Sequence, residues 1–234
     1  MSQPTEVADF VKERLMRIRG DLRLYKDLKP ARTALVIIDM QNAFVAEGGV
    51  IEVAASRDII PAINKMASGC RDLGMPIIWI RSHHPKVGAD WRHFFDHFVH
   101  PDRKDAAAAM LSDDAPTSRF YADMDVRDED YIVIKNRYSC LIPGSSSLER
   151  LLRSQGCDTI ILAGTKTNIC VESTARDAMM LDFRVVVLSD ATAALTAEEH
   201  QAALNVLIQE FADILVVDDV LEELRANASE QSDD

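Results

Sequence analysis

The chain has 234 residues, of which 47% are hydrophobic, with a formal net charge of -12 and a pI near 4.9. This length and composition predict one large or two small folded domains with a sizeable core, and they argue against disorder except at the ends. The acidic balance argues against nucleic acid and anionic membranes as partners, because the long-range electrostatic force would be repulsive.

The four cysteines are scattered without a C-x-x-C pair, which indicates reduced thiols in a reducing compartment. No apolar run approaches the roughly 20 residues that a membrane helix requires. The charged, amphipathic residues 1–25 lack the apolar segment of a signal peptide. We therefore expect a cytoplasmic protein with no membrane partner.

Apolar residues recur at helical spacing from Val7 to Ile18 and predict an amphipathic helix before the first strand. Residues 1–30 are thus expected to form a helical extension, packed either on its own domain or on another subunit. At the other end, residues 227–234 are polar and acidic, and we expect a disordered tail there.

Six short apolar runs predict β-strands, and helical patterns lie between most of them. The expected strands are Thr33–Asp39, Met75–Ile80, Tyr131–Lys135, Thr159–Ala163, Arg184–Leu188 and Ala212–Val217. The expected helices are Asp58–Leu73, Ser145–Gln155, one following Cys170, Thr196–Phe211 and a short one beginning at Leu221. This alternation predicts an α/β fold: a doubly wound, mainly parallel six-stranded sheet with helices on both faces. No linker or repeat divides the chain, so residues 1–234 are expected to form a single domain.

Residues 81–130 interrupt the alternation of strands and helices. The segment is long and polar, and it contains five histidines: His83, His84, His93, His97 and His100. An insertion of this length is expected to serve as a lid or a subunit contact.

Three predicted strands, all expected to be buried, lead into residues suited to one reaction. Asp39 ends the first strand, Lys135 ends the third, and Cys170 follows the fourth at the start of a helix. Carboxyl ends of parallel strands converge on one edge of a sheet, so these groups are expected to meet. The helix N-terminus should favour the thiolate, which is the nucleophilic form. Taken singly, Cys170 could be a small buried hydrophobe, Asp39 a turn cap, and Lys135 a solvated side chain.

Three segments resemble the signatures of the isochorismatase-like cysteine hydrolases, and they occur in the family's order. The segments are Ile37–Phe44 (IIDMQNAF), Lys135–Ser139 (KNRYS) and Gly164–Val171 (GTKTNICV), and the similarity covers about residues 33–224. The resemblance implies a parallel sheet covered on both sides and a catalytic triad of Asp39, Lys135 and Cys170. It further implies a cis peptide between Thr165 and Lys166, and an oxyanion hole formed by the backbone N–H groups of Lys166 and Cys170.

In this family, members with the cysteine act on carbon–nitrogen bonds. The resemblance therefore implies an amidohydrolase that cleaves a small linear amide or ureido (carbamoyl) compound through a thioester intermediate and releases ammonia or an amine. Residues 168–174 look most like the ureidoacrylate amidohydrolase branch, and N-carbamoyl and biuret-type hydrolases share much of this stretch. The family also favours oligomers, so a homodimer or homotetramer is expected.

No metal or other cofactor is expected. Nicotinamidases of this family carry an Asp-x-His motif and a further histidine, but no Asp-x-His follows Phe44 before the second strand. His83 lies where one metal ligand would fall, and a single histidine without partners is a poor zinc site. A hydrogen-bonded structural role is favoured for His83, and nicotinamide is disfavoured as substrate.

The candidate substrate contacts are Gln41, Phe44, Trp91, Tyr138 and Lys166. Trp91 and Tyr138 could equally be core aromatics. Lys166 occupies a position that is usually small or apolar in the family. Its side chain therefore either points to solvent or meets a carboxylate or carbonyl of the substrate.

Other functions remain open. The chain could be a non-catalytic family member that binds a metabolite, a redox sensor built on a reactive thiol, or a nicotinamidase-like amidase. A cofactor-binding α/β protein is disfavoured because no GxGxxG motif or P-loop is present.

Overall fold

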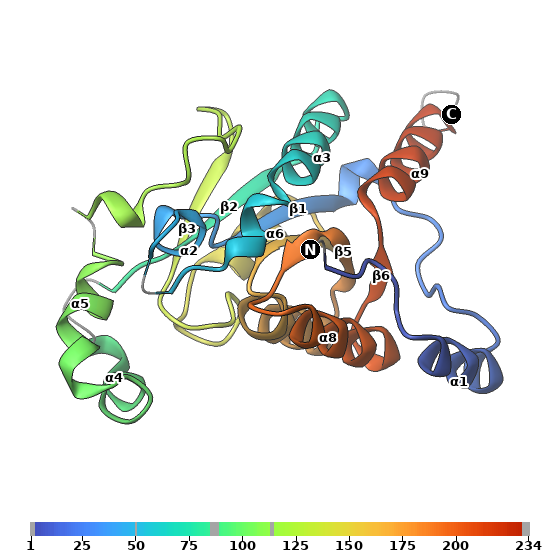
Figure 1. Cartoon of the computed structure of the whole chain (residues 1–234). Helices are drawn as coiled ribbons and strands as arrows, with labels where there is room; N and C mark the ends of the chain where they lie inside the picture. The colour runs from blue at the N-terminus through green and yellow to red at the C-terminus, as the bar shows by residue number, and fades with distance from the viewer. Residues whose placement is uncertain (1–2, 50, 85–88, 113–114, 231–234) are drawn as a thin grey trace.

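The computed structural model describes residues 3–49, 51–84, 89–112 and 115–230 (Figure 1). Six strands form one parallel sheet in the order β3-β2-β1-β4-β5-β6. The strands are β1 (Thr33–Ile38), β2 (Ile77–Ser82), β3 (Tyr131–Lys135), β4 (Thr159–Thr165), β5 (Arg184–Ala193) and β6 (Asp213–Leu215). The all-parallel sheet confirms the predicted fold class.

Helices cover both faces of the sheet because its central strands are apolar on both sides. On β1, Leu35 and Ile37 face one cluster with α3 and α9, whereas Val36 and Ile38 face a second with α1, α6, α7 and α8 (Figure 1). The α-helices are α1 (Asp9–Arg19), α2 (Asn42–Val45), α3 (Ile60–Asp72), α4 (Arg92–His97), α5 (Lys104–Ala109), α6 (Leu148–Ser154), α7 (Glu172–Met180), α8 (Ala197–Glu210) and α9 (Val217–Glu230). Short 3₁₀ turns are Pro30–Arg32, Ala54–Arg57, Ala89–Trp91, Pro101–Arg103 and Pro116–Ser118.

The amino-terminal helix α1 packs on its own domain, which was one of the two possibilities left open by the sequence. Val11 and Leu15 are buried, and the backbone N–H of Ala8 donates to Asn205 Oδ1 of α8 at 2.8 Å. Phe10 and Ile18 remain exposed on the other side of α1.

The predictions for the carboxyl terminus were partly wrong. The last helix begins at Val217 rather than Leu221, and it runs to Glu230, so residues 227–230 are helical. Two features account for the difference: acidic residues occupy the first turn, where they interact favourably with the helix dipole, and Leu224 is buried against the core. Residues 231–234 of the predicted tail lie outside the described residues.

The third strand was expected to be buried, and this was wrong. β3 lies at the edge of the sheet, where Tyr131, Ile132 and Ile134 are exposed and only Val133 and Lys135 are buried. An apolar run does not distinguish a central strand from an edge strand, because that depends on the order of strands in space. β5 is also longer than predicted, and β6 is shorter.

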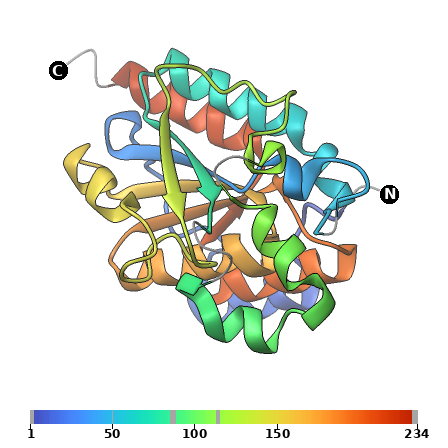
Figure 2. The ribbon, with the colours of Figure 1, turned by 90° about the vertical axis from the view of Figure 1, so that its left-hand side faces the viewer.

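The segment 81–130 begins within β2 and includes α4 and α5, which lie to one side of the sheet, far from α1 and α9 (Figure 1). In the rotated view they lie in front of the sheet, across its lower half (Figure 2). The segment then returns past the end of β1, where Tyr121 N–H donates to the Met40 carbonyl at 2.9 Å. Among the described residues, no helix combines the length and apolar character needed to cross a membrane.

Gly164 allows β4 to approach β1 directly beside the carboxyl end of β1. It has φ 105°, and a Cβ added there would lie 2.1 Å from the Ile38 carbonyl oxygen. This distance leaves no room for any side chain, because the neighbouring atoms belong to the backbone and not to a movable side chain. The close approach sets the position of the turn that carries Cys170.

We predict that Gly164→Ala lowers the free energy of unfolding by about 2–4 kcal/mol, because it adds a steric overlap to an unfavourable φ. The measurement is chemical denaturation. Gly156→Ala is the control, because Gly156 also has positive φ (71°) but no atom within 4 Å of an added Cβ, so it should cost about 1–2 kcal/mol. Equal losses for the two variants would contradict the close-approach explanation.

Candidate active site

Four neighbouring strands bring reactive groups to one edge of the sheet. Asp39 follows β1, Ser82 ends β2, Lys135 ends β3, and Cys170 lies beyond β4. Ser82 is paired in register with Lys135, so β2 lies between the strands that carry the lysine and the aspartate. Lys135 therefore reaches Asp39 across the end of β2, where Ser82 is located.

The three predicted residues form one buried polar cluster. Lys135 Nζ lies 2.8 Å from Asp39 Oδ2 and 3.5 Å from Cys170 Sγ, and it also donates to the Arg137 carbonyl at 3.0 Å. The Ser82 hydroxyl accepts from Lys135 at 2.9 Å and donates to Asp39 Oδ1 at 2.9 Å. All four side chains are buried, with Asp39 0% exposed and Lys135 1%. The arrangement holds an acid–base group and a permanent cation beside one sulfur.

Asp39 adopts a left-handed backbone conformation with φ 56°. Aspartate tolerates this region better than most residues, yet it remains an uncommon conformation for a residue with a side chain. The turn directs the chain out of β1, and the Asp39 carboxylate lies against Lys135 and Ser82 at the strand end. Strained conformations of this kind cluster at functional sites.

The turn that carries Cys170 is irregular. The peptide between Thr165 and Lys166 is cis, and Thr167–Val171 forms one π-helical turn before α7. Short π-helical turns are frequent at functional sites. The Thr167 hydroxyl lies 2.8 Å from Nδ1 of the buried His200 on α8, which fixes this turn to the core. The Lys166 N–H has no acceptor among the described residues, so it is free to donate to a ligand.

The charge state of the cysteine differs from the expectation of a stabilised thiolate. Burial raises the pKa of the Cys170 thiol to about 12, Lys135 opposes this rise, and Asp39 adds to it. Burial by itself would lower the pKa of Lys135, but the neighbouring Asp39 and Cys170 outweigh it and raise the pKa. The resting site therefore contains a thiol beside an ion pair, because desolvation of the sulfur outweighs the neighbouring charge of Lys135.

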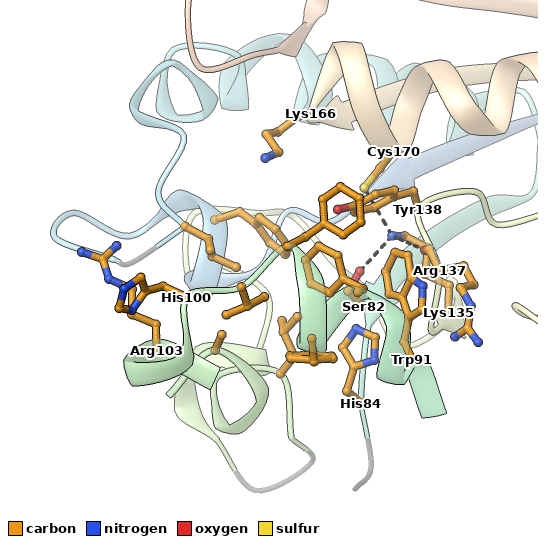
Figure 3. A pocket seen from close by; sticks show the side chains of 18 of the residues that line it. Ser82, His84, Trp91, His100, Arg103, Lys135, Arg137, Tyr138, Lys166 and Cys170 are labelled. Atoms are coloured by element: carbon orange, nitrogen blue, oxygen red, sulfur yellow. Dashed lines mark hydrogen bonds between the residues drawn. The ribbon is translucent and has the colours of Figure 1, made fainter. Parts of the chain in front are cut away.

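A pocket of about 710 Å³ opens onto the sulfur (Figure 3). Phe44, Trp91, Tyr138 and Lys166 line it, together with Cys170, Lys135 and Ser82. In Figure 3 the Lys166 side chain lies on the same side of the pocket as Cys170, and His100 and Arg103 lie at the opposite end. Four of the five candidate substrate contacts thus face the same cavity as the nucleophile.

Gln41 is the exception among the candidate contacts. It is fully buried and does not line the pocket. Its side-chain amide donates to the carbonyls of Ser82 and Ser118, at 3.0 and 2.8 Å, and its oxygen accepts from Ser82 N–H at 2.8 Å. Gln41 therefore positions the backbone of Ser82 instead of contacting a ligand.

Sequence reasoning missed Ser82 and most of the pocket wall. The second strand was expected to end at Ile80, two residues too early, which placed Ser82 in the insertion. The insertion supplies further lining residues, among them His84, Phe94, Phe95 and Phe98. Clustered aromatics in a polar segment were the available signal, because such residues are usually buried in the core or used in binding.

The histidines of the insertion do not assemble a metal site in the part of the chain that the structure describes. His83 Nδ1 makes a hydrogen bond with the Leu111 carbonyl at 2.9 Å, the structural role that the sequence favoured. His84 lies 3.4 Å from Asp90 and packs edge-on against Phe95. Burial lowers the pKa of His84, so its ring is neutral at pH 7.

We predict that iodoacetamide alkylates Cys170 about tenfold faster for each pH unit between pH 7 and 9, because the thiolate fraction rises by that factor well below a pKa. The measurement is the rate of carbamidomethylation of the Cys170 peptide by mass spectrometry, with Cys157 in the same protein as an internal comparison. A rate that is already constant above pH 7 would show a preformed thiolate and contradict the raised pKa.

Comparisons with known proteins identify the family of the chain. The Isochorismatase domain family matches residues 33–219. The ureidoacrylate amidohydrolase RutB of Pseudomonas syringae pv. syringae is 31% identical over 206 residues, which are 82% of this chain and 83% of that protein. The probable inactive nicotinamidase At3g16190 of Arabidopsis thaliana is 34% identical over 176 residues, 73% of this chain and 85% of that protein. The crystal structure of a cysteine hydrolase from Pseudomonas syringae pv. phaseolicola 1448A superposes with a TM-score of 0.81 at 26% identity, covering 90% of this chain and 100% of that one. The chain therefore belongs to the isochorismatase family and is an isochorismatase-like cysteine hydrolase.

Proposed function

We propose that the protein is a cysteine-dependent amidohydrolase that cleaves a carbon–nitrogen bond of a linear amide or ureido compound. The observation that carries this proposal is the cluster of Asp39, Lys135 and Cys170, which is buried at one end of a 710 Å³ pocket. A thiol, a general base and a fixed cation are the parts that nucleophilic attack on an amide carbon requires.

In the first step, the Cys170 sulfur attacks the carbonyl carbon while its proton passes to the Asp39 carboxylate. Because the pKa of Cys170 is raised, we assign this proton transfer to the same step as the attack. Lys135 keeps its charge beside both groups. Negative charge therefore moves from the carboxylate to the substrate oxygen without leaving Lys135 unpaired in the protein interior.

In the next steps, the backbone N–H groups of Lys166 and Cys170 stabilise the oxyanion, a contribution of roughly 3–4 kcal/mol for a donor in other acyl-transfer enzymes. Asp39 then gives its proton to the departing nitrogen, the C–N bond breaks, and a thioester to Cys170 remains. Water, deprotonated by Asp39, attacks the thioester and releases the acid, and the proton returns to the sulfur. Ammonia or an amine is the second product.

The similarity to a ureidoacrylate amidohydrolase supports a ureido compound as the substrate. The charge of Lys166 favours an anionic substrate. Its side chain lines the pocket and has no carboxylate within ion-pairing distance among the described residues. Arg103 and Arg137 also line the pocket, and Asp102 is its one lining carboxylate among the described residues. A substrate with a carboxylate would be attracted to such a site.

Three alternatives remain as outcomes of the tests below. A redox sensor is disfavoured by the raised pKa of Cys170, because oxidation proceeds through the thiolate. A non-catalytic role is suggested by the probable inactive nicotinamidase among the relatives, but the assembled cluster favours catalysis. A nicotinamidase-like amidase is the enzyme alternative.

We predict that the protein releases ammonia from at least one member of a panel of ureido acids, carbamoyl amino acids and simple amides. Cys170→Ser should lower kcat by at least about 10³-fold, because a hydroxyl is a far weaker nucleophile in this site. Cys157→Ser is the control, since Cys157 is an equally buried free cysteine without contact to the pocket. Ammonia release by Cys170→Ser at the parental rate would overturn the proposal.

We further predict that Lys166→Ala raises KM for carboxylate-bearing substrates about tenfold, because it removes an unpaired cation from the pocket. The measurement compares KM for a ureido acid with KM for its uncharged amide in both proteins. Lys65→Ala, in which an exposed lysine is lost from α3, is the control. An unchanged KM for the acid would show that the Lys166 side chain faces only solvent.

A further inference from the structure

Five of the aromatic side chains that line the pocket contact one another, and we refer to these five as the aromatic wall. They are Trp91, Phe94, Phe95, Phe98 and Tyr138. Trp91 stacks on Phe94 with ring centroids 4.7 Å apart and meets Tyr138 edge-on at 4.7 Å. Phe94 stacks on Phe98 at 6.1 Å. The wall is thus one connected set of rings, four of which come from the segment 81–130.

The aromatic wall adjoins the reactive sulfur. The Tyr138 ring lies next to Cys170 and the Trp91 ring lies below Lys135 in Figure 3. Tyr138 and Cys170 line the same pocket, and burial raises the pKa of Tyr138. A group attached to the scissile bond would therefore contact these rings.

The rings of the aromatic wall do not cover one another completely. Phe98 is 73% exposed and Tyr138 is 37% exposed, although both line the cavity. Aromatic rings bury 150–250 Å² when covered, so exposed ones leave apolar surface that a ligand can remove from water. Trp79, in contrast, is completely buried, and its indole N–H donates to Asp130 Oδ2 at 2.8 Å.

The pocket is also larger than a short ureido acid requires. A cavity of about 150 Å³ is enough to hold benzene, whereas this pocket has about 710 Å³. A ureido group needs hydrogen-bond partners, and the phenylalanine rings of the wall provide none. The space along the wall therefore suits an apolar group and does not suit the polar reacting group.

We infer that the natural substrate carries an aromatic or similarly bulky apolar group beside the scissile carbon–nitrogen bond, and that the aromatic wall is the subsite that binds it. The inference rests on the proposed function, because it places the reacting carbon at Cys170. The ureido or amide group then lies at Cys170 and Lys166, and the bulky group lies along Trp91 and Phe94.

The first test compares substrates that differ by one ring. N-carbamoyl-L-phenylalanine is paired with N-carbamoyl-L-alanine, and 3-phenylpropionamide is paired with propionamide. We expect kcat/KM to favour the ring-bearing member by at least about 30-fold, since one methylene in an apolar pocket is already worth 10-fold or more. Equal values, or a preference for the smaller member in both pairs, would overturn the inference.

The second test removes one ring from the wall. Phe94→Ala should lower the ratio of kcat/KM between the paired substrates about tenfold, and Phe94→Leu should lower it less, because it keeps apolar volume. Phe10→Ala is the matched control, since Phe10 is 65% exposed on α1 and does not line the pocket. The same ratio in Phe94→Ala, Phe94→Leu and the parent would contradict the assignment of this subsite.

A binding measurement separates the subsite from the chemistry. The chain has two tryptophans, of which Trp91 lines the pocket and Trp79 is fully buried. In Cys170→Ser, 3-phenylpropionamide should change the tryptophan fluorescence saturably, propionamide at equal concentration should not, and Trp91→Phe should abolish the change. Turnover of small ureido acids without this binding would overturn the inference while the proposed function stands. Saturable ring binding with no turnover of any panel compound by the parent would support the subsite and contradict the proposed function.

Discussion

The site depends on an ion pair between Asp39 and Lys135 that is almost completely removed from water. Two charges in this position are stable only when each compensates the other and their remaining polar atoms are hydrogen-bonded. Ser82 meets this requirement, because its single hydroxyl accepts from the lysine and donates to the aspartate. Loss of either charge would leave its partner buried and uncompensated, at a cost of about 3–5 kcal/mol. Cys170 occupies the remaining position beside Lys135, and its proton is held by the same electrostatic balance.

The order of the strands in the sheet brings these groups together. The order β3-β2-β1-β4 places the lysine on the edge strand and the aspartate two strands inward, so a long, flexible side chain is needed to span the end of β2. Gln41 fixes the backbone of Ser82 at that end, and Gly164 allows the cysteine-bearing turn to lie close to β1. The geometry of the reactive groups therefore follows from strand register and one close backbone contact more than from the loops that surround them.

Much of this arrangement could be predicted from sequence, because each strand has an apolar signature that locates its end to within a few residues. Asp39, Lys135 and Cys170 were found in this way, and the family signatures agreed. Features that depend on spatial order could not be found: the exposed face of β3, the role of Ser82, and the burial of Gln41. The state of the thiol was misjudged for a related reason. A helix start is visible in the sequence, but the loss of water around the sulfur appears only in three dimensions.

The nucleophile and the larger part of the pocket lining come from separate stretches of chain. Cys170 and its turn follow the central strand β4, whereas α4 and its neighbours are inserted between β2 and β3. Insertions and deletions between those two strands can therefore remodel ligand selectivity without shifting the bond-breaking groups. New substrate specificities can therefore evolve by exchange of this one inserted segment, while the rest of the fold is kept. The same segment is the natural unit to exchange when chimeras are built between relatives.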